Sequence, residues 1–126
     1  MKNLNFGLLL LRVTFGLFLA GHGLGKVLDL AAGKTSFADP IGIGPVPSLV
    51  LAAFAEFVCA LAVVLGFKTR WAAIPPVVTM LVAAFIVHAN DDWGTKEFPL
   101  LYASGFLTLV FTGGGRYAID GRSKKR

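Results

Sequence analysis

The chain has 126 residues, of which 56% are hydrophobic and 15% are charged, and its formal net charge is +5. Soluble domains carry about 25% charged residues, and a soluble domain of this size could not hide four long apolar segments from water. The composition therefore excludes an ordinary soluble domain and predicts a single membrane domain over residues 1–126.

Four apolar segments fill this domain, at residues 4–21, 48–67, 71–88 and 98–114. They are 18, 20, 18 and 17 residues long, and a helix needs roughly 17–25 residues to cross a bilayer core of about 30 Å. They lack the alternation of β-barrel strands. The sequence predicts an all-α membrane protein whose four transmembrane helices form an up-down-up-down bundle.

Basic residues concentrate on one side of this predicted bundle. Eight of them lie on the side of the two termini: Lys2, Lys68, Arg70, Arg116, Arg122, Lys124, Lys125 and Arg126. Only Lys26, Lys34 and Lys96 lie on the other side. The positive-inside rule therefore predicts that both termini are cytoplasmic. We interpret the basic tail as an anchor beside anionic lipid rather than a nucleic-acid-binding segment.

The connections between the segments differ in length. The first connection, about residues 22–47, is long. Near its start, Gly21 and Gly25 have the G-x-x-x-G spacing of closely packed helices, although a helix end suits them equally. The second is a turn of only three residues, 68–70. The prolines at 75–76 then predict a kink or a delayed start in the third crossing.

Two charged residues stand inside the first two crossings, where burial in lipid is costly and usually marks function. Arg12 lies in the first crossing and Glu56 in the second, and no other acid lies within a crossing. Their similar depths predict an Arg12–Glu56 ion pair, which would offset the burial of both charges. Two alternatives stay open: Arg12 can extend toward the interface, and Glu56 can be protonated, because burial disfavours the charged form.

A second group of polar residues lies at the outer level of the predicted bundle. His22 and His88 end the first and third crossings, and Lys26 shares a face with His22 if that helix continues. These imidazoles could cap helices, bind an anionic group or move a proton. No H-E-x-x-H or other fixed ligand spacing is present, so no metal site is predicted. Tyr102 could donate to a quinone-like carbonyl, although tyrosines at this level usually belong to the aromatic belt.

Short motifs over nearly the whole chain follow one another in a characteristic order. They are Leu11-Arg12-Val13 with Gly16, Gly21-His22-Gly23 with Lys26, Glu56 with Ala60-Leu61 and Leu65-Gly66-Phe67, Thr69-Arg70 with Ala72-Ala73, His88, and Gly113 to Asp120. Their order and spacing together resemble those of the DoxX family.

The resemblance implies a four-helix, multi-pass protein of the bacterial inner membrane. The family takes its name from subunits of an archaeal thiosulfate:quinone oxidoreductase, and relatives are linked to membrane complexes that handle thiol and oxidative stress. It also implies one polar site, formed by Arg12, His22, Lys26, Glu56 and His88. It does not by itself imply catalysis.

The leading hypothesis is a small membrane subunit of a redox system that holds a quinone or similar ligand near the outer face. In this hypothesis Glu56 and His22 manage protons, Arg12 holds Glu56, and His88 and Lys26 orient an anionic or carbonyl group. The chain has one cysteine and no Rossmann or P-loop fingerprint, so redox chemistry needs a bound cofactor or a soluble or membrane partner. The chain is then at most an accessory subunit of an oxidoreductase.

Two alternatives remain. The chain could be a component of a small-solute transporter or channel, which would require a homo-oligomer because four helices make a thin wall. It could also be a non-catalytic assembly partner of a membrane complex. The sequence identifies neither the ligand nor the partner.

Overall fold

A computed structural model describes residues 2–34 and 42–123, and helices without strands make up this part of the chain. The elements are α1 (Lys2–Ala31), α2 (Pro45–Ala53), the π-helix η1 (Phe54–Cys59), α3 (Ala60–Leu65), α4 (Thr69–Ala72), α5 (Ile74–Val82), the π-helix η2 (Ala83–Val87), α6 (Trp93–Thr112) and α7 (Ile119–Ser123). The all-α class predicted from the sequence is confirmed.

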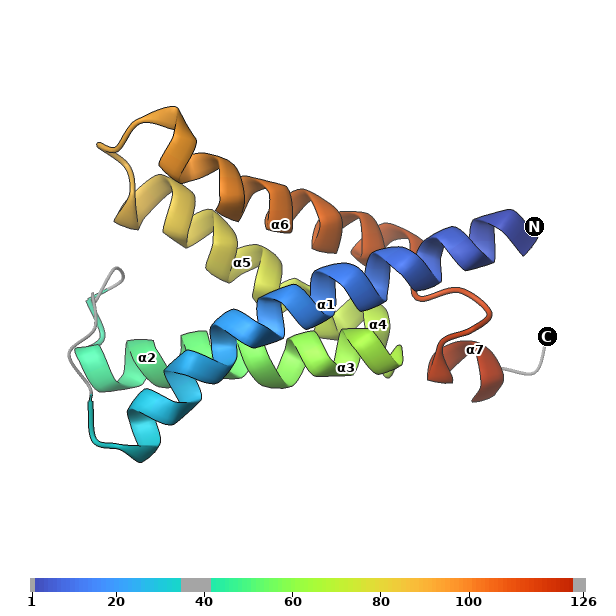
Figure 1. The fold of residues 1–126 in the computed structure, drawn as a ribbon, viewed down its shortest axis with the longest axis horizontal. Coiled ribbons are helices and arrows are strands. Elements are labelled where there is room, and N and C mark those ends of the chain that lie inside the picture. Colours follow the sequence, from blue (N-terminus) through green and yellow to red (C-terminus); the bar gives the residue numbers. More distant parts are fainter. Residues whose placement is uncertain (1, 35–41, 124–126) are drawn as a thin grey trace.

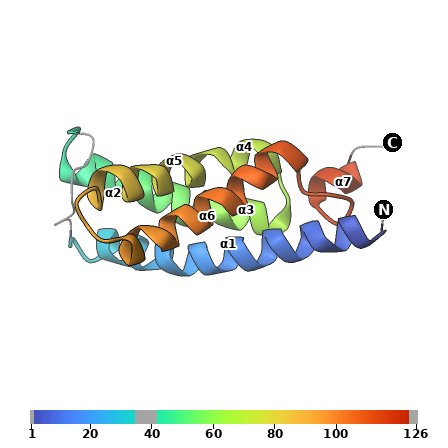
Figure 2. The same ribbon diagram turned by 90° about the horizontal axis from the view of Figure 1, so that it is seen from above.

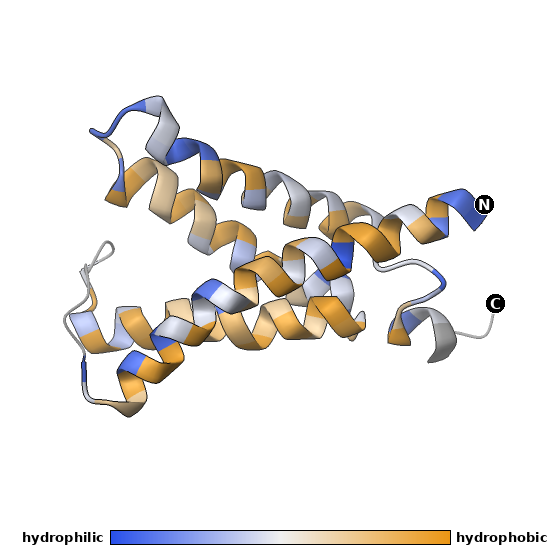
Figure 3. Ribbon diagram, viewed as in Figure 1, coloured by the Kyte–Doolittle hydropathy of each residue, from blue (hydrophilic) through white to orange (hydrophobic). Residues whose placement is uncertain are grey.

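Three helical runs are long and apolar enough to cross a membrane. They are α1, the run Pro45–Leu65 formed by α2, η1 and α3, and the run Thr69–Val87 formed by α4, α5 and η2. Figure 3 shows these runs mostly in apolar colours, whereas α6 begins with polar residues. α6 is 20 residues long, but it does not meet the same test of length and composition. The fourth crossing stays a prediction.

The helices form an elongated bundle of two packed pairs. α1 packs along η1 and α3, and α5 packs along α6 (Figures 1 and 2). The beginning of α1, the α3–α4 turn, the end of α6 and α7 lie together, and we name this the terminal end. The end of α1, the beginning of α2 and the η2–α6 connection lie at the opposite end, which we name the loop end.

The first helix is longer than the sequence predicts. We expected it to end near Gly21, but α1 continues to Ala31. Gly23 explains the continuation, because it lies against the second run so closely that a Cβ there would be 2.6 Å from the Glu56 carbonyl oxygen. Glycine permits such close approach of two backbones. The contact with η1 therefore holds the helix together where glycines alone would weaken it.

The glycines that make the helix contact, Gly16 and Gly23, are not the pair that the sequence suggested. A Cβ on Gly16 would lie 2.9 Å from the Ala60 carbonyl oxygen, whereas a Cβ on Gly21 or Gly25 would meet no atom of the described residues within 4 Å. Gly16 and Gly23 are seven residues apart, which is close to two helical turns, so they lie on one face of α1. Among the described residues Gly21 and Gly25 therefore make no helix contact, and the alternative that they mark the helix end is wrong, because α1 continues to Ala31.

Prolines and a glycine shape the middle of the chain. α3 ends at Gly66, whose φ of 77° is left-handed, and α4 is a single short turn. α5 begins at Ile74 with Pro75 and Pro76 in its first turn, where a missing N–H costs little. The predicted break near the start of the third crossing is confirmed.

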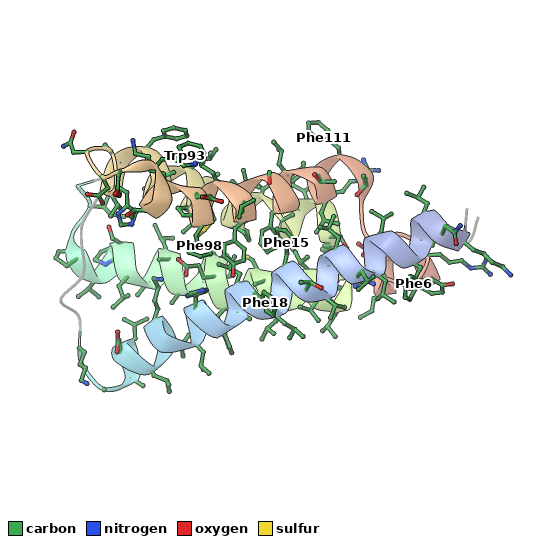
Figure 4. All side chains as sticks on the ribbon, turned by 45° about the horizontal axis from the view of Figure 1, so that its top comes forward. Phe6, Phe15, Phe18, Trp93, Phe98 and Phe111 are labelled. Atoms are coloured by element: carbon green, nitrogen blue, oxygen red, sulfur yellow. The ribbon has the colours of Figure 1, made fainter. Side chains whose placement is uncertain are left out.

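The core lies between the two helix pairs. It contains Leu19 of α1, Val63 of α3 and Phe106 of α6, all at most 1% exposed. The ring of Phe15 meets the Phe106 ring edge-on, with centroids 6.3 Å apart, and lies between α1 and α6 in Figure 4. Phe111, by contrast, is 72% exposed and stands on the outer surface. Large apolar side chains on the outside are what a bilayer environment requires.

Replacing Gly23 with alanine tests the packing of α1. The new Cβ would overlap the backbone of η1, and overpacking costs about 1–3 kcal/mol, against a gain of about 1 kcal/mol in helix propensity. We expect the Gly23→Ala protein to melt at a lower temperature in mild detergent. Gly21→Ala is the matched control, because its Cβ meets no atom within 4 Å. Equal melting temperatures for the two variants would contradict the contact.

Candidate functional site

A buried ion pair joins α1 to η1. Lys26 Nζ donates a hydrogen bond to Glu56 Oε1 over 2.7 Å. The Glu56 side chain is only 5% exposed, whereas that of Lys26 is 24% exposed. A carboxylate can remain charged at such burial when a cation pairs with it. The lysine is thus the accessible member of the pair and the glutamate the buried one.

The predicted Arg12–Glu56 pair is wrong. Arg12 is 1% exposed, and its guanidinium donates to backbone carbonyls instead of a carboxylate. Nε donates to the Gly114 oxygen over 3.1 Å, and Nη1 donates to the oxygens of Val63 (3.3 Å) and Val64. These partners lie toward the terminal end of the bundle, and the alternative that Arg12 extends toward the nearer interface stays a prediction.

Distance along α1 explains why Lys26, and not Arg12, meets Glu56. The two cations are 14 residues apart, which corresponds to about 21 Å along a helix. Arg12 lies beside the end of α3, where the Val63 oxygen also accepts the N–H of Gly66 and where the last carbonyls of a helix can accept from other donors. A guanidinium has five N–H donors and suits such a group of oxygens. Arg12 thus stabilises the terminal end of the bundle and lies outside the site around Glu56.

Two further side chains extend this group, with Tyr102 interacting with Glu56 and His22 lying against Tyr102. Tyr102 of α6 is within electrostatic reach of Glu56, and the exposed His22 meets the Tyr102 ring edge-on, with centroids 6.0 Å apart. Phe15 meets the same ring from another side, also at 6.0 Å. We name the group Lys26, Glu56, Tyr102 and His22 the ion-pair site.

Tyr102 is the residue that the predicted polar site lacked. The sequence placed its hydroxyl near the outer level, and that was the only signal available. The half-buried position beside Phe15 and His22 distinguishes it from an aromatic-belt tyrosine, which would face the interface.

His88 lies in the connection after η2. Its Nδ1 is 2.7 Å from Asp91 Oδ2, and both side chains are partly exposed. Lys96 of α6 donates to the Ala89 carbonyl in the same connection. These contacts organise the loop end between η2 and α6. Of the five predicted site residues, the structure thus pairs Lys26 with Glu56, places His22 against Tyr102, and gives Arg12 and His88 other partners.

Glu56 and His88 both lie at π-helical turns. Glu56 lies inside η1, and His88 directly follows η2. π-helical turns are rare and are frequent at functional sites. Within residues 2–34 and 42–123, no cluster of three or more His, Cys, Asp and Glu residues could hold a metal ion.

The sequence matches a known protein family over most of its length. The DoxX family model matches residues 7–89, a range that includes all five predicted site residues but ends before Tyr102. The chain belongs to the DoxX family.

Two relatives cover nearly the whole chain. It is 33% identical to "Inner membrane protein YqjF" of Escherichia coli (strain K12), over 95% of each chain. It is 30% identical to "Putative oxidoreductase CatD" of Bacillus subtilis (strain 168), over 94% of this chain and 88% of the relative. No solved structure matches the chain. Family, relatives and apolar helices together define a multi-pass protein of the bacterial inner membrane.

A double-mutant cycle tests the ion pair. We expect Lys26→Met to lower the melting temperature strongly, because removing one partner of a buried pair costs about 3–5 kcal/mol. Adding Glu56→Leu should restore part of that stability, since no unpaired charge then remains. The measurement is thermal unfolding of all variants in mild detergent.

The same cycle with Arg12→Met in place of Lys26→Met is the control. Arg12 and Glu56 share no contact, so their effects should add within about 0.5 kcal/mol. A larger coupling of Glu56 with Arg12 than with Lys26 would contradict the assigned pair.

Proposed function

We propose that this protein is a small membrane subunit of a redox system and that its ion-pair site binds a quinone or a similar carbonyl ligand. The observation that supports the proposal best is the Lys26–Glu56 pair, whose glutamate is buried within the second run and interacts with Tyr102. Ionisable residues inside membrane helices are rare and mark ligand or proton pathways. The name of the Bacillus subtilis relative is in line with a redox role.

The residues of the site suit a carbonyl ligand. An ammonium group has three donors, and one N–H of Lys26 is directed to Glu56, so two remain for a ligand oxygen. The Tyr102 hydroxyl is a further donor, the Phe15 ring beside it offers an apolar surface to a planar ligand, and the His22 imidazole is a further polar group. Glu56 would accept or release the proton that accompanies reduction or oxidation of the ligand. Arg12 has only a structural role in this proposal.

The proposal includes four crossings with both termini in the cytoplasm. α6 is 20 residues long and packs along α5, so it has the length and the neighbour of a fourth crossing. Lys2, Lys68, Arg70 and Arg116 belong to the terminal end, which favours a cytoplasmic position for that end. The ion-pair site would then lie nearer the outer face.

Electrons would come from a partner. The chain has a single cysteine, Cys59, which is buried, and its sequence carries no nucleotide-binding fingerprint. A soluble or membrane-bound oxidoreductase would supply the redox group, and this chain would be its accessory subunit.

Transport of a small solute is the second candidate, because ionisable pairs inside membrane helices also serve proton-coupled transporters. The same buried Lys26–Glu56 pair favours it. In this case the protein would act as a homo-oligomer.

Titration with a short-chain ubiquinone analogue tests the redox proposal. Tyr102→Phe keeps the ring and removes the hydroxyl, and Lys26→Met removes the charged donor. A hydrogen bond contributes about 0.5–1.5 kcal/mol and one from a charged group about 1.5–3 kcal/mol. We therefore expect affinity to fall about two- to tenfold in Tyr102→Phe and at least about tenfold in Lys26→Met.

Lys34→Met is the matched control, because Lys34 lies beyond the end of α1 and its loss should leave affinity unchanged. The measurement is analogue binding to the full chain in lipid nanodiscs. Lack of binding by the wild-type protein, together with solute flux into proteoliposomes that disappears in Glu56→Gln, would overturn the redox proposal in favour of transport.

A further inference from the structure

The terminal end of the bundle holds a second site, remote from Glu56. An open pocket of about 860 Å³ lies between the first turns of α1, the residues around α4, the end of α6 and the beginning of α7. These segments converge at one end of the bundle in Figure 1. The ion-pair residues do not line this pocket, so the proposed quinone role leaves it without a function.

The pocket is strongly basic. Lys68, Arg70 and Arg116 line it, and Asp120 is its acidic residue, so the lining has a net formal charge of +2. All three cationic residues are exposed. They can therefore meet a ligand without rearrangement of the core. A basic pocket between membrane helices is the expected form of an anion site beside lipid head groups.

Asp120 shapes the pocket, because its carboxylate is bound to the backbone of the turn. Its two carboxylate oxygens accept hydrogen bonds from the backbone N–H groups of Lys68 and Thr69, each over 2.7 Å. Its own N–H donates to the Gly66 carbonyl. The negative charge is thus engaged with the turn and lies within electrostatic reach of Arg12.

The turn holds Lys68 in an unfavourable backbone conformation. Its φ of 48° makes it the one non-glycine residue with positive φ in the described part of the chain. Residues held in such conformations often belong to ligand clamps. Here the Asp120 hydrogen bonds maintain the conformation and place Lys68 at the pocket.

The pocket also contains an unused hydrogen-bonding group. Thr69 lines the pocket and is fully buried, and its Oγ1 has no hydrogen-bond partner in the described part of the chain. A Cβ on Gly114 would lie 2.7 Å from this oxygen, so the hydroxyl faces the space that the glycine leaves open. An unpaired buried hydroxyl is unfavourable unless a ligand or water satisfies it.

An aromatic residue indicates the depth of the pocket in the membrane. Trp71 lines the same pocket and is 76% exposed. Tryptophans on membrane proteins concentrate at the level of the lipid head groups. The phosphates of the lipids lie at this level, so a lipid phosphate would be within reach of the three basic residues.

We propose that this terminal-end pocket binds a phosphate group, with Lys68, Arg70 and Arg116 providing charge and the Thr69 hydroxyl providing a directed hydrogen bond. The phosphate belongs either to an anionic lipid head group or to a soluble phosphate. Bidentate pairing makes arginine especially suited to phosphate oxygens.

The test uses the full chain in mild detergent, with phosphatidylglycerol, phosphatidylcholine and inorganic phosphate as separate probes. Bound probe is counted by native mass spectrometry, and the melting temperature is followed during titration. Protection by phosphatidylglycerol above that by phosphatidylcholine assigns the site to an anionic lipid, and protection by inorganic phosphate alone assigns it to soluble phosphate. Protection by neither overturns the proposal.

A triple variant, Lys68→Gln, Arg70→Gln and Arg116→Gln, removes the charge of the pocket. Because each basic residue near an anionic lipid surface strengthens binding about fivefold, the loss should be on the order of a hundredfold. The matched control removes three charges from the C-terminal tail: Lys124→Gln, Lys125→Gln and Arg126→Gln. Equal losses in the two triple variants would show general charge attraction and overturn the pocket.

Thr69→Val separates the ligand role of the hydroxyl from a structural one. Because Oγ1 has no protein partner among the described residues, the melting temperature without probe should stay the same or rise. Binding of the probe should weaken about two- to tenfold. A lower melting temperature without probe, or unchanged binding, would overturn the assigned hydrogen bond.

Discussion

Two cations of α1 find partners on neighbouring segments, one at each end of the contact between α1 and the α2–α3 run, and the rest of the structure depends on this arrangement. Lys26 pairs with Glu56 near the loop end, and Arg12 donates to carbonyls in the last turn of α3 and to the Gly114 carbonyl at the terminal end. Gly16 and Gly23 bring the backbones together between them. In an apolar environment water cannot replace these partners, so the polar groups specify the register of the two helices.

The same constraint creates both candidate sites. Close packing of Gly23 on η1 places Lys26 beside the Glu56 carboxylate, and α6 adds Tyr102 across the bundle. At the other end, the carbonyls that hold Arg12 come from the residues where helices stop and the chain turns. Such turns gather loop residues and glycines, and there the basic pocket forms. Helix packing thus separates a buried, neutralised site from an exposed, positively charged one.

Much of this could be predicted from the sequence, because apolar composition and segment length are local properties. The all-α class, the break before Pro75 and the choice of Glu56 as a candidate site residue followed from single segments. The partner of Glu56 could not be predicted in this way. Arg12 and Lys26 both belong to α1, and only their positions along that helix decide which of them reaches Glu56 on η1. The extent of α1 was missed for a related reason: glycines that weaken an isolated helix are stabilised here by contact with η1.

The sequence by itself determined that this protein lies in a membrane and which few ionisable residues matter there. This is because the free energy of transferring each side chain into lipid depends on its own chemistry. Only the tertiary structure decided which charges meet. That choice depends on the relative shift and rotation of two packed helices, which the contacts of Gly16 and Gly23 set at the scale of single ångströms. It also brought Tyr102 to the ion pair and the residues around Asp120 to one pocket, since residues far apart in the chain become neighbours only when the bundle closes.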